Sequence, residues 1–199
     1  MKSRKKIIRQ MGYMRDQEGI MNRYLHEKSN WQSHLQNTRK FIEESFGDPS
    51  IKSVAVLGSG WLLDVPLKEL SSRFEHVYLA DIRHPAQIRK KVESMHKVEL
   101  IETDLSGGAI EQLWDLAQKK VEAQGSSLLD KLSLQPPLGH ISPDAVISVN
   151  LLNQLDIILC DYMSKKGYFQ QEDSSRLRTA LQEFHLQWIT ETPGCLVSD

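Results

Sequence analysis

The chain lacks the features that mark secreted, disulfide-rich or membrane proteins. Its 199 residues include two cysteines, Cys160 and Cys195, which argues against a disulfide framework and fits a reducing compartment. No apolar run approaches the length that spans a membrane, and the first residues lack the apolar core of a secretory signal. We therefore expect a cytoplasmic globular protein that makes no contact with a membrane.

Several catalytic motifs are missing as well. The 7 histidines form no pair at ligand spacing on a common helix, so no metal site is expected. No Gly-Lys-Ser/Thr run completes a Walker loop. Ser59 is flanked directly by glycines, and no Gly-x-Ser-x-Gly nucleophile elbow occurs. These absences count against zinc enzymes, Walker-type nucleotide hydrolases and serine hydrolases of the elbow type.

Residues 1–50 are polar and contain no strand-like run. Their first part carries the basic residues Lys2, Arg4, Lys5, Lys6 and Arg9, without an acid. Such a run is typical of a solvated, partly disordered arm and less often of a nucleic-acid contact. One helix face is predicted from the spacing of Trp31, Leu35, Thr38, Ile42 and Phe46, with Asn30 as its cap. Residues 1–50 are thus expected to form a helical cover, in which Trp31 and His34 take core or rim positions.

From residue 51 onward, short apolar strands alternate with amphipathic helices. Strands are predicted at 51–57, 77–81, 98–102, 144–149 and 195–198, and helices at 65–74, 86–94, 109–123, 150–166 and 174–190. Alternation of this kind means parallel strands joined by right-handed crossovers. The predicted fold class is α/β, a doubly wound, mostly parallel sheet of about five strands with flanking helices. Residues 131–134 fit either a short strand or an extended segment.

The most informative motif follows the first strand. The apolar run 54–57 breaks into Gly58-Ser59-Gly60, where two residues lack side chains and backbone N–H groups can approach a ligand. About twenty residues later the second strand ends in Asp81, where a carboxylate would hold the hydroxyls of a nucleoside ribose. Together the two features predict a nucleoside cofactor.

The order of these motifs resembles the class I S-adenosylmethionine-dependent methyltransferases. The resemblance covers roughly residues 51–199, as a Rossmann-like domain, and implies methyl transfer with S-adenosyl-L-methionine as cofactor. The cofactor-binding residues that it implies are Gly58, Ser59, Gly60, Asp81, Ile82, Asp104, Leu105 and Asn150. A small-molecule acceptor is favoured over nucleic acid, because the body of the domain is acidic rather than basic.

The resemblance also implies a role for each of these residues. The glycine loop would pass the methionine and ribose parts of the cofactor, and Asp81 would hold the ribose. Asp104 would receive the adenine amino group, although it could equally cap the next helix. Ile82 and Leu105 would pack against the adenine. Asn150 would lie near the sulfonium, or else cap a helix.

The sequence departs from the family pattern at three places. Val56 stands where the family commonly has an acid, and Leu62 where a third glycine often completes the loop. Asp64 either supplies the missing carboxylate or caps the following helix. The family sheet normally continues past the fifth strand, so we expect a domain that is C-terminally truncated or a homo-oligomer joined through the strand-five edge.

Two other functions remain open. The chain could be a non-catalytic Rossmann-like binding module, which Val56 and Leu62 favour. A nicotinamide-dependent oxidoreductase would share the glycine loop and Asp81, but its fingerprint requires glycine or alanine at the position of Leu63.

Overall fold

The computed structural model describes residues 4–119 and 126–198, to which all structural statements below refer. At its centre is a five-stranded sheet in the order β3-β2-β1-β4-β5, with every pair of neighbouring strands parallel. The strands are β1 (Ser53–Leu57), β2 (His76–Asp81), β3 (Val98–Glu102), β4 (Ala145–Val149) and β5 (Gly194–Val197). The predicted α/β doubly wound fold is therefore confirmed.

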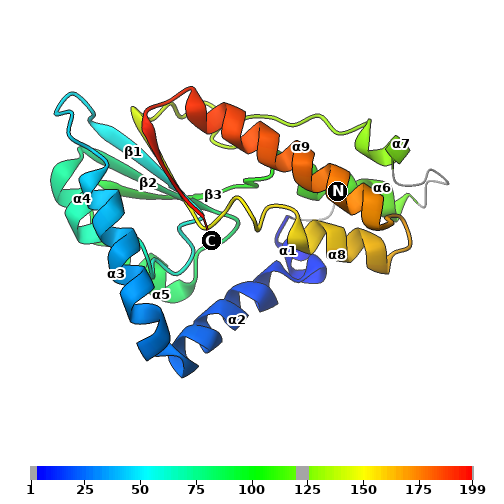
Figure 1. The fold of residues 1–199 in the computed structure, drawn as a ribbon, viewed down its shortest axis with the longest axis horizontal. Helices are drawn as coiled ribbons and strands as arrows, with labels where there is room; N and C mark the ends of the chain where they lie inside the picture. Colours follow the sequence, from blue (N-terminus) through cyan, green and yellow to red (C-terminus); the bar gives the residue numbers. More distant parts are fainter. Residues whose placement is uncertain (1–3, 120–125, 199) are drawn as a thin grey trace.

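Helices cover both faces of this sheet (Figure 1). They are α1 (Arg4–Met11), α2 (Tyr13–His26), α3 (Lys28–Glu44), α4 (Leu67–Arg73), α5 (Ala86–Val92), α6 (Ala109–Gln118), α7 (Ser126–Leu129), α8 (Ile157–Lys165) and α9 (Gln171–Thr190). Successive side chains of a strand point to opposite faces, so β1 serves two cores. Ala55 and Leu57 pack with residues of α1, α6, α8 and α9, whereas Val54 and Val56 pack with residues of α3, α4 and α5.

The strand order reverses between β1 and β4. β1 pairs with β2 on one side and with β4 on the other, so the loops that follow these strands diverge at their carboxyl ends. In open α/β sheets, ligands bind in the crevice at this switch point. The loops that carry the predicted site residues follow β1, β2, β3 and β4, so all of them leave the sheet at the carboxyl ends of its strands.

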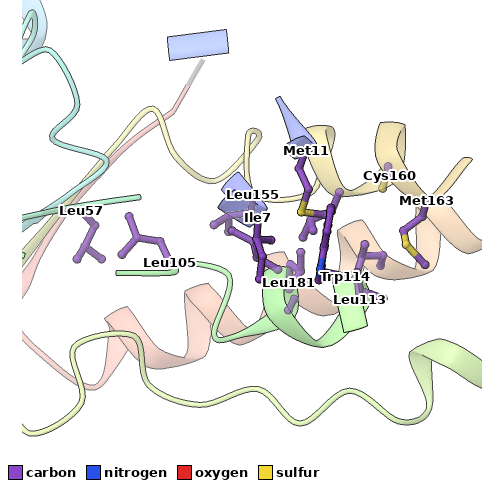
Figure 2. Packing of buried hydrophobic residues seen from close by; sticks show 14 of the residues in the cluster. Ile7, Met11, Leu57, Leu105, Leu113, Trp114, Leu155, Cys160, Met163 and Leu181 are labelled. Carbon is purple, nitrogen blue, oxygen red and sulfur yellow. The ribbon is translucent and has the colours of Figure 1, made fainter. Parts of the chain in front are cut away.

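From Arg4 onward, the basic N-terminal run forms the helix α1. In α1 the side chains of Ile7, Ile8 and Met11 are buried, and Ile7 and Met11 belong to the core cluster that contains Trp114 and Leu155 (Figure 2). For these described residues the prediction of a partly disordered arm was wrong, because the spacing of the three apolar residues buries one stripe of a helix whose lysines stay outside. Lys2 lies outside the described residues.

Other local predictions also need correction. α3 begins before Asn30, which therefore lies inside the helix and does not cap it. Asn150 caps no helix either, because α8 starts at Ile157 with Asp156 in the cap position. Residues 131–134 form no strand. The end of the helix predicted at 109–123 lies partly outside the described residues, which omit 120–125.

Two predictions concern contacts of the protein with a second chain and with a membrane. β5 pairs only with β4 and forms one edge of the sheet as described. Association of two chains through this edge stays a prediction. Across residues 4–119 and 126–198, no helix combines the length and apolar character required to cross a bilayer.

Packing of α1 into the core predicts its contribution to stability. Ile7→Ala should lower the free energy of unfolding by about 2–5 kcal/mol, because it leaves a cavity in the core shared with Trp114. Lys6→Ala, on the exposed side of the same helix, should change it by less than about 0.5 kcal/mol. Urea unfolding measures both, and identical midpoints for the two variants would contradict the packing of α1.

Candidate functional site

A cavity of about 670 Å³ opens at the carboxyl ends of the strands. Its walls come from the loops after β1, β2, β3 and β4, together with α2 and α3. All eight residues predicted to bind a cofactor line it: Gly58, Ser59, Gly60, Asp81, Ile82, Asp104, Leu105 and Asn150. The volume is typical of a small-molecule site. The structure thus brings the predicted residues together, while their role in binding a cofactor stays a prediction.

The glycine turn after β1 is packed against its neighbours. Gly58 has φ 78°, and a Cβ atom there would lie 2.7 Å from the carbonyl oxygen of Val149. Gly60 has φ 30°, and a Cβ atom there would lie 3.4 Å from Oδ2 of Asp81. Side chains are therefore excluded at Gly58 by the backbone of β4 as well as by its own conformation. At Gly60 the backbone carries no side chain and faces the carboxylate of Asp81 at the end of β2.

Asp81 is held in place by backbone N–H groups. Its Oδ2 accepts a hydrogen bond from the N–H of Gly60 at 2.8 Å, and the N–H groups of Ile82 and Arg83 also bond to the carboxylate. Burial raises the pKa of Asp81 to about 6, against the lowering effect of these bonds, and the charge of Glu102 adds to the rise. A carboxylate offers about four acceptor sites, so these three bonds leave Asp81 about one site for a ligand.

Ser59 connects the glycine turn to a buried histidine. Its Oγ lies 2.9 Å from Nε2 of His84 and 3.3 Å from the carbonyl oxygen of Ala80. Burial lowers the pKa of His84 to about 4, so the ring is neutral at pH 7. The backbone N–H of His84 donates to Glu102, which also pairs with Arg89. These bonds fix the loop after β1 to the loop after β2.

Asp104 organises its own loop. One carboxylate oxygen accepts hydrogen bonds from the backbone and hydroxyl of Ser106, and the other accepts the N–H of Ile110 at 3.1 Å. Asp104 therefore bonds to the first turn of α6 without occupying its cap position, which is Gly108. Burial, and then the nearby Asp104, raise the pKa of Glu111. The adenine contact of Asp104 stays a prediction, and most of its acceptor sites are already occupied.

Asn150 and Asp64 join the loop after β4 to the loop after β1. The Nδ2 group of Asn150 donates to Oδ2 of Asp64 at 2.7 Å. Burial raises the pKa of Asp64, and bonds that include the one from Asn150 partly reverse that rise. Asp64 does not cap α4, whose cap position is Pro66. Val56 is buried in the core with α3. Asp64 lines the cavity, and its role as the missing carboxylate stays a prediction.

The residues of α2 that line the cavity were not among the predicted site residues, although a helical cover was expected over residues 1–50. Gln17 of α2 donates from Nε2 to the carbonyl oxygen of Arg83 at 2.8 Å, and its own carbonyl oxygen accepts the indole N–H of Trp61 at 2.7 Å. These bonds hold α2 above the glycine turn and Asp81. Trp31 and His34 of α3 also line the cavity. Gln17 could not be identified from the sequence, because its partners Arg83 and Trp61 lie far away along the chain.

Neither a metal site nor a similar protein indicates which function the cavity has. Within the part of the chain that the structure describes, no three His, Cys, Asp or Glu side chains are grouped to hold a metal ion. No protein-family model matches the chain, and comparison with curated proteins finds no significant relative. The functional interpretation therefore depends on the residues of the cavity.

The geometry of the glycine turn predicts different costs for two alanine substitutions. Gly58→Ala should lower the free energy of unfolding by at least about 1–2 kcal/mol, because its φ is left-handed and its Cβ would meet the carbonyl oxygen of Val149. Gly47→Ala is the control, since nothing lies within 4 Å of a Cβ there. Chemical denaturation compares the two, and a Gly58→Ala variant as stable as the control would contradict the described turn.

Proposed function

We propose that the protein transfers a methyl group from S-adenosyl-L-methionine to a small-molecule acceptor. The observation that carries the proposal is the convergence of all eight residues implied by the methyltransferase resemblance on one cavity. They come from loops separated widely in the sequence, so their convergence does not follow from any single turn. A cavity of about 670 Å³, closed in part by α2, fits a small acceptor alongside a nucleoside cofactor.

The residues present fit such a cofactor on structural grounds. Gly60 offers a backbone without a side chain, and beside it Asp81 retains about one acceptor site for a ribose hydroxyl. Ile82 and Leu105 line the cavity as apolar surfaces suited to a flat base. The buried Oδ1 of Asn150 has no hydrogen-bond partner among the described residues.

The chemistry places modest demands on the protein. S-adenosylmethionine supplies a methyl group that its positive sulfur already activates. The cavity residues then have to orient the two reactants and exclude water, which is the role of the bound geometry in such a displacement. α2, held by Gln17 to Arg83 and Trp61, limits access of solvent to the glycine turn.

A non-catalytic binding module is the second candidate. It is favoured by Val56, which is completely buried and leaves no acid at the position where the family commonly has one. The nicotinamide-dependent alternative is weaker, because Leu63 occupies the position that its fingerprint reserves for glycine or alanine.

Calorimetry distinguishes these functions. We expect saturable binding of S-adenosylmethionine and S-adenosylhomocysteine and none of NAD. Asp81→Ala should weaken binding of S-adenosylhomocysteine by about 1–3 kcal/mol, because it removes the acceptor for the ribose hydroxyls. Asp115→Ala, on the exposed side of α6, should leave the affinity unchanged. Binding of NAD alone would support the oxidoreductase, and equal affinity of the two variants would remove Asp81 from the site.

The raised pKa of Asp81 predicts a pH dependence of binding. If the ionised carboxylate accepts the ribose hydroxyls, affinity for S-adenosylhomocysteine should be constant above about pH 7. It should fall below about pH 6, by up to about tenfold per pH unit, as the carboxyl group is protonated. Titration calorimetry from pH 5 to 8 tests this, with Asp81→Asn as the reference. A decline of the same steepness in Asp81→Asn would assign the titration to another group.

A further inference from the structure

Helix α2 forms a wall of the cavity without a core of its own. None of its 14 residues has a buried side chain, whereas α1, α3, α6, α8 and α9 each bury at least three. Between residues 16 and 23, the side chains that line the cavity are those of Asp16, Gln17, Ile20 and Arg23. The inner face of this stretch therefore lies against the cavity instead of packed side chains. Short helices in proteins owe most of their stability to such packing, which α2 lacks.

The two ends of α2 are held by aromatic side chains. α2 connects α1 to α3 (Figure 1). At its start, Tyr13 packs against the core cluster that contains Trp114. Near its end, the ring of Tyr24 meets that of Trp31 in α3 edge to face, with centroids 6.1 Å apart. The middle of the helix thus spans the cavity between two fixed ends.

Gln17 fastens this middle stretch to the loops below it. Its Nε2 donates to the carbonyl oxygen of Arg83 after β2, and its own carbonyl oxygen accepts the indole N–H of Trp61 after β1. A Cβ atom at Gly60 would lie 4.0 Å from the same Nε2, so Gln17 stands directly over the glycine turn. Hydrogen bonds of this kind each contribute modestly to stability. They hold the helix in place and still allow it to detach.

Two glycines weaken α2 further. Gly12 occupies the cap position with φ 108° and offers no side chain to cap the first turn. Gly19 lies in the interior of the helix, where glycine is less favourable than alanine because it gives up more backbone freedom. Elements with few buried contacts and weak local propensity open at the lowest free energy. α2 combines both properties.

We propose that residues 16–23 form a gate to the cavity, which opens by local unfolding of α2 while the sheet and the core helices stay folded. The open state admits a ligand to the loops after β1 and β2. A bound ligand fills the space under the inner face of α2 and so stabilises the closed helix. The opening itself is a property of the unliganded protein and does not depend on the function proposed above.

Hydrogen exchange followed by NMR measures this opening. In the unliganded protein, the amides of residues 16–23 should have protection factors at least about tenfold lower than those of α6, and similar to one another, as one cooperative opening requires. The indole N–H of Trp61 should exchange with them, because its acceptor belongs to α2. The indole of Trp114, buried in the core, should exchange more slowly. Protection of α2 equal to that of α6, or of the Trp61 indole after α2 has exchanged, would overturn the proposal.

Gln17→Ala tests the role of the fastening bond. It removes the donor to Arg83, so the protection factors of residues 16–23 and of the Trp61 indole should fall by about threefold to tenfold. Alanine favours a helix at least as well as glutamine, so helix propensity cannot cause such a fall. Gln32→Ala, on an exposed side of α3, is the matched control and should leave these values unchanged. No change in Gln17→Ala, or an equal fall in α6, would overturn the proposal.

Gly19→Ala should act in the opposite direction. A Cβ atom there meets only the guanidinium of Arg23, at an ordinary distance of 3.6 Å, so the variant fits the helix. The protection factors of residues 16–23 should rise by about fourfold to fivefold, because alanine stabilises a helix interior relative to glycine. Unchanged protection in this variant would contradict opening by local unfolding, since that process must respond to helix propensity.

The coupling of the gate to binding is tested with S-adenosylhomocysteine and rests on the function proposed above. Stopped-flow kinetics should show association and dissociation rate constants that both rise in Gln17→Ala and both fall in Gly19→Ala, with a smaller change in affinity. Rate constants equal to those of the unmodified protein in both variants would mean that the ligand enters elsewhere and would overturn the gate. Failure to bind S-adenosylhomocysteine would refute the methyl-donor function, whereas hydrogen exchange in the unliganded protein would still decide the opening of α2.

Discussion

The backbone of the turn after β1 lies so close to its neighbours that no side chain fits at Gly58, and the rest of the cavity depends on this approach. On one side the turn faces the carbonyl oxygen of Val149 at the end of β4. On the other, the N–H of Gly60 donates to Asp81 at the end of β2. Because β1 lies between β2 and β4 in the sheet, one short turn sets the relative positions of three loops. The hydrogen bond between Ser59 and His84 then holds the turn against the loop after β2.

Two buried acids line the cavity. Asp81 accepts hydrogen bonds from backbone N–H groups and has a pKa raised to about 6, so it loses its charge under mildly acidic conditions. Asp64 accepts a hydrogen bond from the amide of Asn150. Both acids have raised pKa values mainly because of burial. Since a buried carboxylate is costly, the bonds from Gly60 and Asn150 offset part of that cost.

The sheet and the glycine loop could be predicted because their signals are local. The apolar run of β1 and the turn at Gly58 lie within a few consecutive residues, and the strand-helix alternation repeats this pattern. α1 was missed because its lysines dominated the composition, although the spacing of Ile7 and Met11 indicated a buried helix face. The bond between Gln17 and Arg83 joins residues 66 positions apart and has no counterpart in the sequence. For Asn150 the sequence left two roles open, and only the tertiary structure shows that the residue faces the cavity.

Helices α1 and α3 contact opposite layers of the fold, and this has a consequence for folding. α1 packs against α6 and α8, while Ile42 of α3 lies in the core on the opposite face. Of the residues that share a core with Ile7 of α1, Leu159 and Leu181 lie far away along the chain, in α8 and α9. Such long-range contacts slow folding and leave apolar surface exposed meanwhile. The buried face of α1 that carries Ile7 is therefore completed only when α8 and α9 have packed against the same side of the sheet.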